Sequence, residues 1–194
     1  PVGANGPESW VWWAWIGDHT DEIASAVREH VTLTLIAVGL GLVIALPVAL
    51  AAHRWRALAT PALAVTGVIY TIPSLALFAF FVPITGLSRT TAEIALVGYT
   101  LLILIRNTLT GLAGGSSEVR EAAEGMGYDA TARLLRVELP LAVPAIIAGL
   151  RIATVTTIGL VTVTALIGQG GLGTLILDGY GRYFKTPLVV GAAL

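Results

Sequence analysis

Cysteine is missing from this sequence, and charged side chains are scarce. The chain of 194 residues has no cysteine, which excludes disulfides, thiolate metal sites and cysteine nucleophiles. Charged residues make up only 12% of the chain, whereas soluble domains carry roughly 25%. The formal net charge is −1, so no broad basic face indicates nucleic-acid binding. With 56% hydrophobic residues, the composition predicts an integral membrane protein.

Catalytic patterns are also missing. The three histidines, His19, His30 and His53, form no HExxH pair, and His53 is expected in a loop without a partner. No Ser–His or Asp pair lies inside an apolar segment, so we expect no catalytic residue, no metal and no cofactor held by this chain. An ion-coupled secondary transporter remains an alternative, but Glu93 is its only acidic candidate and lies at the end of an apolar segment.

Long apolar segments predict an all-α fold with about five transmembrane helices, four complete and a fifth truncated. A helix needs about 20 residues to cross the hydrocarbon core. A flexible glycine turn at 168–173 and a polar loop with Asp178, Arg182 and Lys185 precede the last segment. The expected spans are 31–52, 61–82, 90–111, 144–167 and the incomplete 186–194.

Two of these spans are expected to line a solute path. The second span should break near Pro73 and Ser74, because proline disfavours helix in the residue before it. Broken membrane helices face protein or a water-filled cavity, although a mere packing kink is the alternative. The fourth span carries Thr154, Thr157 and Thr164 near one face, whose hydroxyls either line the path or bond their own backbone.

Other features of the spans predict packing and lipid contact. Ala145, Gly149 and Ala153 recur every four residues, which favours close helix–helix packing. The first span is apolar nearly all round, so positions such as Leu35 and Ala49 are expected to face lipid.

Residues 1–30 form a polar, tryptophan-rich segment, separate from the membrane domain at 31–194. Tryptophans near a first span usually lie at the lipid–water interface, and an aromatic cage for a cation is the alternative. With the N-terminus outside, six basic residues fall in the inner loops and four in the outer segments, in agreement with the positive-inside rule. The tryptophans are Trp10, Trp12, Trp13 and Trp15.

The polar stretch at 117–140 predicts two short helices joined at a glycine. Ser117 is expected to cap the first helix, and Gly127 to end it with a positive φ. Asp129 is expected to cap the second helix, and Pro140 to end it. This elbow is too polar for lipid, and its paired alanines leave a narrow ridge that suits insertion into a groove of a partner.

The same stretch resembles the signature of the permease subunits of ABC importers. In that family the elbow docks into a cleft of a cytoplasmic ATPase dimer, which binds ATP with Mg. The resemblance also implies a second permease, identical or a sister chain, a substrate-binding protein outside the cytoplasmic membrane of a prokaryote, and alternating access across the bilayer. The matching residues are Glu121, Ala122, Ala123, Gly127, Val137, Leu139 and Pro140.

Three further segments indicate which group of ABC-importer permeases the chain resembles. Residues 71–77, 105–108 and 167–173 are similar to the permeases that import osmoprotectants such as glycine betaine, proline betaine, choline and carnitine. Permeases of methionine importers share the elbow and the Gly-Gly-Leu-Gly turn but match less well around 105–108. The resemblance therefore implies an osmoprotectant importer, with a methionine-type or other amino-acid importer as the alternative.

Overall fold

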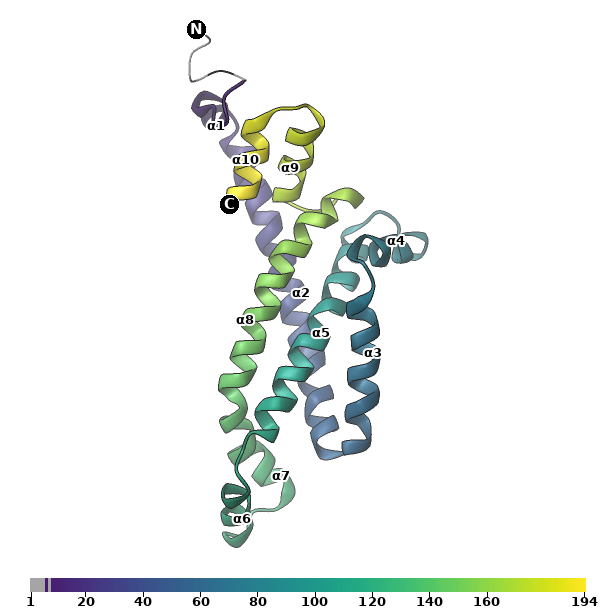
Figure 1. The fold of residues 1–194 in the computed structure, drawn as a ribbon, viewed down its shortest axis with the longest axis vertical. Helices are drawn as coiled ribbons and strands as arrows, with labels where there is room; N and C mark the ends of the chain where they lie inside the picture. The colour runs from purple at the N-terminus through teal and green to yellow at the C-terminus, as the bar shows by residue number, and fades with distance from the viewer. Residues whose placement is uncertain (1–5, 7) are drawn as a thin grey trace. The chain divides into compact units, whose positions relative to one another are not determined.

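The computed structural model describes residue 6 and residues 8–194. The first five residues of the predicted interfacial segment, and residue 7, lie outside the described residues. The described part contains helices and turns, with no strand among its residues, which confirms the predicted all-α fold (Figure 1). The chain divides into two compact units: residues 1–37, 73–96 and 156–194 make unit 1, and residues 38–72 and 97–155 make unit 2.

The first long helix, α2, runs over Thr20–Arg54 and starts well before the predicted span. Asp21 and Glu22 lie in its first turn, where negative charge is favourable to the helix dipole. His53 lies in its last turn, so the expectation of a loop histidine was wrong. The helix continues because the residues up to Arg54 include neither glycine nor a second proline after Pro47.

The second apolar segment is broken where the sequence predicts it. After a 3₁₀ turn at Arg56–Leu58, helix α3 runs over Ala59–Thr71 and helix α4 over Ser74–Thr85. Ile72 has φ −67° and ψ 129°, and Pro73 has φ −55° and ψ 135°, so both are extended. Proline excludes the helical conformation at the residue before it and lacks the amide that would continue the ladder.

Helix α5 covers Arg89–Ala113 and α8 covers Leu139–Thr164, close to the predicted third and fourth spans. The described residues thus hold three helices that are long and apolar enough to cross a membrane, or four if α3 and α4 count as one broken span. The predicted fifth span corresponds to α10, a helix of nine residues at Lys185–Ala193.

In unit 2 the helices approach closely through small residues. A Cβ atom on Gly149 would lie 2.6 Å from the Cβ of Asn107, and one on Gly111 would lie 2.8 Å from the Cβ of Ala145. Ala153 is completely buried, so the alanine–glycine repeat of α8 is confirmed as a packing stripe.

One face of α2 belongs to the same core. Ala45 and Ala49 are buried against Leu104 and Ala153, so the expectation that Ala49 faces lipid was wrong. Leu35 and Val43 are about two-thirds exposed, at 65% and 69%. At Ala45 and Ala49 the packed face of the helix carries small side chains, whereas Val43, on the exposed face, is large.

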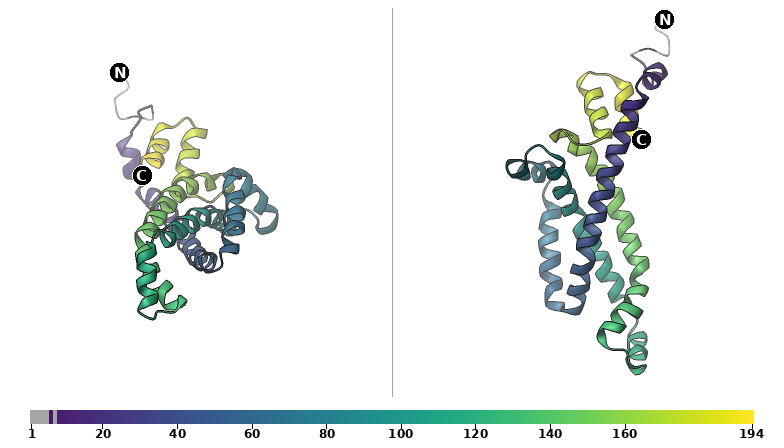
Figure 2. Two further views of the ribbon diagram at one scale, coloured as in Figure 1. Left: turned by 60° about the horizontal axis from the view of Figure 1, so that its bottom comes forward. Right: turned by 180° about the vertical axis from the view of Figure 1, so that it is seen from behind.

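Unit 1 contains α1 (Trp13–Asp18) and the pair α9 (Leu172–Gly181) and α10, which lie side by side in both views of Figure 2. The polar loop predicted before the last span is therefore mostly the helix α9. The residues Leu172 and Leu175 explain the difference, because they are buried against Ala26 and stabilise the helix by packing.

The glycine turn before α9 is packed rather than flexible. Gly171 has φ +47°, and a Cβ there would lie 2.6 Å from the backbone nitrogen of His30. The Gly171 amide also donates a hydrogen bond to a Glu29 carboxylate oxygen at 3.3 Å. Only glycine fits both the positive φ and this close approach to α2.

Candidate functional site: the coupling elbow

The elbow begins with helix α6, Ser117–Gly125. Its cap is Ser116, one residue earlier than predicted, whose hydroxyl oxygen accepts from the Val119 amide at 3.4 Å. The Ser116 side chain also hydrogen-bonds the carboxylate of Glu118 and thereby lowers the pKa of this exposed group. Adjacent serines explain the shift of one residue, because either can cap a helix and only the turn geometry decides between them.

The end of α6 is determined by Gly127. This glycine has φ +82°, as predicted. The Gly127 amide donates to the Glu124 carbonyl at 2.9 Å, and the Tyr128 amide donates to the Ala123 carbonyl at 3.1 Å. These two bonds form a Schellman motif, which satisfies carbonyl groups at the helix end and turns the chain sharply.

The second helix of the elbow does not end at Pro140. Helix α7, Ala130–Arg133, is capped by Asp129, whose carboxylate accepts from the Ala132 amide at 2.6 Å. It continues through a π-helical turn at Leu134–Glu138 into α8. In that turn the Leu139 amide bonds the Leu134 carbonyl, five residues back. The wider turn moves the carbonyl that Pro140 would otherwise meet, so the helix passes the proline.

A buried carboxylate lies at the centre of the elbow. Glu138 is only 4% exposed, and its two oxygens take different partners. One oxygen lies 2.7 Å from Nε2 of His53, at the end of α2. The other accepts from Nε of Arg133 at 3.0 Å and lies 3.6 Å from Nε of Arg120. Charged groups this deeply buried need such partners.

The two arginines tie the rest of the elbow to the same carboxylate. Arg120 of α6 also donates from Nη2 to the Leu112 carbonyl of α5 at 3.0 Å. Arg133 of α7 forms a second ion pair with Glu124 of α6. Helices α2, α6 and α7 therefore meet at Glu138 through ion pairs, and Arg120 links α5 to them through its hydrogen bond to Leu112. The elbow, seen beyond the ends of α5 and α8 in Figure 1, is attached to its own transmembrane helices as one block.

This cluster borders a cavity of about 530 Å³ in unit 2. None of the four side chains was expected in a functional site from the sequence, where the arginines counted only as loop charges. The expectation that His53 has no partner was wrong, because its ring lies against Glu138. A carboxylate next to the start of an apolar span was the available signal, since it is buried there only with counter-charges. The four residues are His53, Arg120, Arg133 and Glu138.

The predicted coupling residues divide between two faces. Ala123 is 1% exposed and packs inward, whereas Glu121 and Ala122 are exposed on α6. Pro140 is exposed and Leu139 half-buried at the start of α8. The structure thus brings one alanine of the pair into the elbow's interior and leaves a narrow exposed ridge beside it.

The predicted pathway residues do not all share one environment. The hydroxyl of Thr154 donates to the Leu150 carbonyl and that of Thr164 to the Val161 carbonyl, both at 2.8 Å. For these two threonines the structure agrees with the alternative to a path-lining role, in which the hydroxyl bonds the backbone of its own helix. Thr157 is buried, Ser74 is half-buried at the first position of α4, and Pro73 is exposed.

Comparison with known proteins shows the family of the chain. The profile of the family described as "Binding-protein-dependent transport system inner membrane component" matches residues 37–194. The choline transport system permease protein OpuBB of Bacillus subtilis is 38% identical over 171 residues, which cover 88% of this chain and 79% of that protein. The osmoprotectant import permease protein OsmW of Salmonella typhimurium is 38% identical, over 91% of this chain and 85% of that protein.

Among solved structures, an inward-facing form of the MetNI methionine ABC transporter is similar in fold. The TM-score is 0.79 at 22% sequence identity, and the match covers 91% of this chain and 88% of the other. The family profile covers the second half of α2, the long helices α5 and α8, and the elbow between them. The chain therefore belongs to the inner-membrane permease components of binding-protein-dependent transport systems.

Proposed function

We propose that this chain is the permease subunit of an ATP-driven importer of small quaternary-ammonium osmoprotectants. The observation that carries the proposal is the similarity to permeases named for choline, for glycine betaine, carnitine and choline, and for osmoprotectants, at 37–38% identity over most of each chain. These substrates share a methylated ammonium group. A passage for such solutes needs weak polar contacts rather than a buried countercharge that would trap a cation.

The elbow suits the coupling step of such an importer. The exposed ridge at Glu121 and Ala122 would enter a cleft of a cytoplasmic ATPase, which binds ATP with Mg and closes as a dimer. The Glu138 cluster would pass this movement to α2 through the ion pair with His53 and to α5 through the hydrogen bond of Arg120 to Leu112, while α8 continues directly from Glu138. A second permease, identical or a sister chain, completes the pore, and a binding protein delivers the solute from outside.

The proposed orientation has the N-terminus outside and the elbow in the cytoplasm. It rests on the excess of basic residues in the loops on the elbow side. It also rests on the polarity of the elbow, whose ion pairs suit water and the surface of a partner rather than lipid.

We also propose that the break at Pro73–Ser74 and the threonine face of α8 line the solute path. Extended backbone at membrane depth is tolerated beside protein or water. Single cysteines at Ser74 and Thr154, the half-buried members of this set, should react with a water-soluble thiol reagent, and the reaction should change with ATP. A cysteine at Leu35 should remain unreactive. Reaction at Leu35 alone would contradict the assignment of the path.

Uptake by the reconstituted complex tests the proposed substrate. The permease, its ATPase and its binding protein would be placed in liposomes with ATP inside. Labelled glycine betaine, choline and methionine would be compared in parallel. We expect ATP-dependent accumulation of the first two. Accumulation of methionine alone would favour the amino-acid alternative, and uptake that follows an ion gradient without ATP would overturn the importer mechanism.

A further inference from the structure

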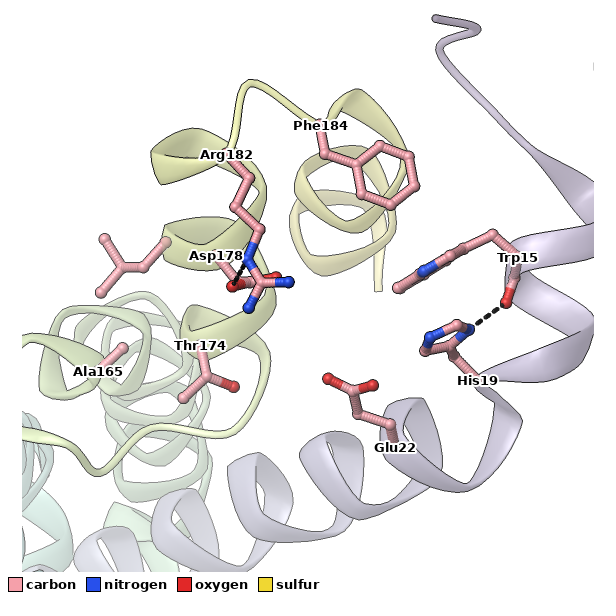
Figure 3. A pocket seen from close by; sticks show the side chains of 9 residues that line it. Trp15, His19, Glu22, Ala165, Thr174, Asp178, Arg182 and Phe184 are labelled. Carbon is pink, nitrogen blue, oxygen red and sulfur yellow. Dashed lines mark hydrogen bonds and ion pairs between the residues drawn. The ribbon is translucent and has the colours of Figure 1, made fainter. Parts of the chain in front are cut away.

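A second cavity, of about 650 Å³, lies within unit 1 and is lined by aromatic and charged side chains (Figure 3). Trp15 and His19 come from α1 and the residue after it, and Glu22 from the first turn of α2. Asp178 and Arg182 come from α9 and its end, and Phe184 precedes α10. We name this cavity the aromatic pocket.

Two rings form a corner of the aromatic pocket. Trp15 and Phe184 have centroids 5.5 Å apart and planes at 83° to one another. His19 stacks on Trp15 at 4.3 Å, and its Nδ1 lies 2.9 Å from the Trp15 carbonyl oxygen. Trp12 packs on Phe184 at 6.2 Å. Two of the four tryptophans of the N-terminal segment, Trp12 and Trp15, thus pack against Phe184 from the far end of the chain.

The charges of the aromatic pocket lie on two sides. The Glu22 carboxylate points toward the space beside Trp15 (Figure 3). Across that space Asp178 and Arg182 form an ion pair of 2.7 Å between positions i and i+4 of a helix. Arg182 is 74% exposed, and exposed pairs of this kind contribute little to stability. Arg182 can therefore turn to an incoming anion at small cost.

We propose that the aromatic pocket binds a small zwitterion with a methylated ammonium group. The ammonium would lie in the corner of Trp15 and Phe184, near the Glu22 carboxylate, and the carboxylate of the ligand would face Arg182. Aromatic faces attract a cation that lacks strong hydrogen-bond donors, and the nearby carboxylate adds Coulomb attraction. The proposal deepens the proposed function and rests on its substrate class, because it places a transient site for that substrate on the permease itself.

The same unit already holds a cation against a tryptophan. Nζ of Lys185 lies 5.2 Å from the centroid of Trp10, and it also donates to the Glu8 carbonyl at 3.2 Å. Neither Trp10 nor Lys185 lines the aromatic pocket, so this pair lies outside it. The volume of the aromatic pocket lies within the roughly 300–1,000 Å³ of small-molecule sites.

Direct binding to the permease–ATPase complex, without the binding protein, tests this site. Labelled glycine betaine would be the probe, with choline and tetramethylammonium as competitors. Trp15→Leu should weaken the binding of all three between about 2-fold and 30-fold, and Trp15→Phe should retain most of it. Glu22→Gln, at an exposed position whose change leaves the packing intact, should weaken all three as well. Arg182→Gln should weaken glycine betaine but not tetramethylammonium.

Trp13→Leu is the matched control, because Trp13 is on the same helix, is 69% exposed and does not line the aromatic pocket. It should bind all three probes like the unchanged complex. A complex that transports glycine betaine yet binds none of the probes without the binding protein would overturn the site and leave the proposed function standing. If Trp15→Leu lost binding-protein docking while the binding of the probes stayed unchanged, the proposed site would be overturned as well. If the complex bound the probes but transported no quaternary-ammonium compound, the proposed function would be contradicted instead.

Discussion

Replacing Glu138 by glutamine keeps the size of the side chain but removes the charge at the centre of the elbow. The carboxylate is 4% exposed and takes hydrogen bonds from His53 at 2.7 Å and from Arg133 at 3.0 Å. Hydrogen bonds to charged groups contribute about 1.5–3 kcal/mol each, and glutamine still accepts one of them through its amide oxygen. The three basic partners are 21–30% exposed, so water compensates for part of the loss.

We therefore expect Glu138→Gln to weaken the attachment of the elbow by about 2 kcal/mol, which is roughly a 30-fold larger opening constant. Hydrogen exchange of the purified complex measures this opening. The amides of Tyr128 and Ala132, bonded to Ala123 and Asp129, should exchange faster. Transport should fall more than ATP hydrolysis, because a loosened elbow transmits less of the ATPase movement.

Glu118→Gln is the matched control for this experiment, because Glu118 is an exposed carboxylate on the same elbow. We expect unchanged exchange at Tyr128 and Ala132 and unchanged transport. Equal protection of these amides in Glu138→Gln and in the unchanged protein would refute the structural role of the buried carboxylate. Equal loss in both variants would show that the effect comes from charge in general rather than from the cluster.

Three other substitutions test the elbow, its orientation and the packing that supports it. Gly127→Pro should abolish ATPase co-purification, because proline cannot adopt φ +82°, whereas Gly125→Ala, inside α6, should be neutral or stabilise the helix by up to about 1 kcal/mol. Cysteines at Ser117 and Asp178 should label with an impermeant reagent from opposite sides of the membrane, and labelling of both from outside would reverse the proposed topology. Gly149→Val should lower the thermal stability of the purified protein, because a Cβ at this position overlaps α5; unchanged melting would contradict the close packing.

Local chemistry explains why the elbow was predictable. Gly127 and Asp129 act within a few residues of their own positions, through one backbone conformation and one cap. The break at Pro73 is equally local, since the pyrrolidine ring excludes helix at the preceding residue whatever surrounds it. The prediction that Pro140 ends the second helix was wrong for a related reason. Proline destabilises the helix locally, but a π-helical turn at Leu134–Glu138 accommodates it, and no local signal distinguishes a helix end from such a turn.

The charged cluster and the aromatic pocket depend on contacts between distant parts of the chain. His53 and Glu138 are 85 positions apart and contribute to one buried site only because α2 and α8 pack in unit 2. Trp15 and Phe184 meet because α10 packs within unit 1, where the Trp12 amide bonds the hydroxyl of Thr186 at 3.0 Å.

The sequence by itself determined the membrane class, the order of the long helices, the break in the second span and the elbow. Each follows from composition or from interactions within about one helical turn. Only the tertiary structure decided which face of α2 is packed, that α9 is a helix, and which charges meet at Glu138. Apolar periodicity cannot rank two hydrophobic faces in a membrane helix, and a charge count along the chain does not record which side chains become neighbours.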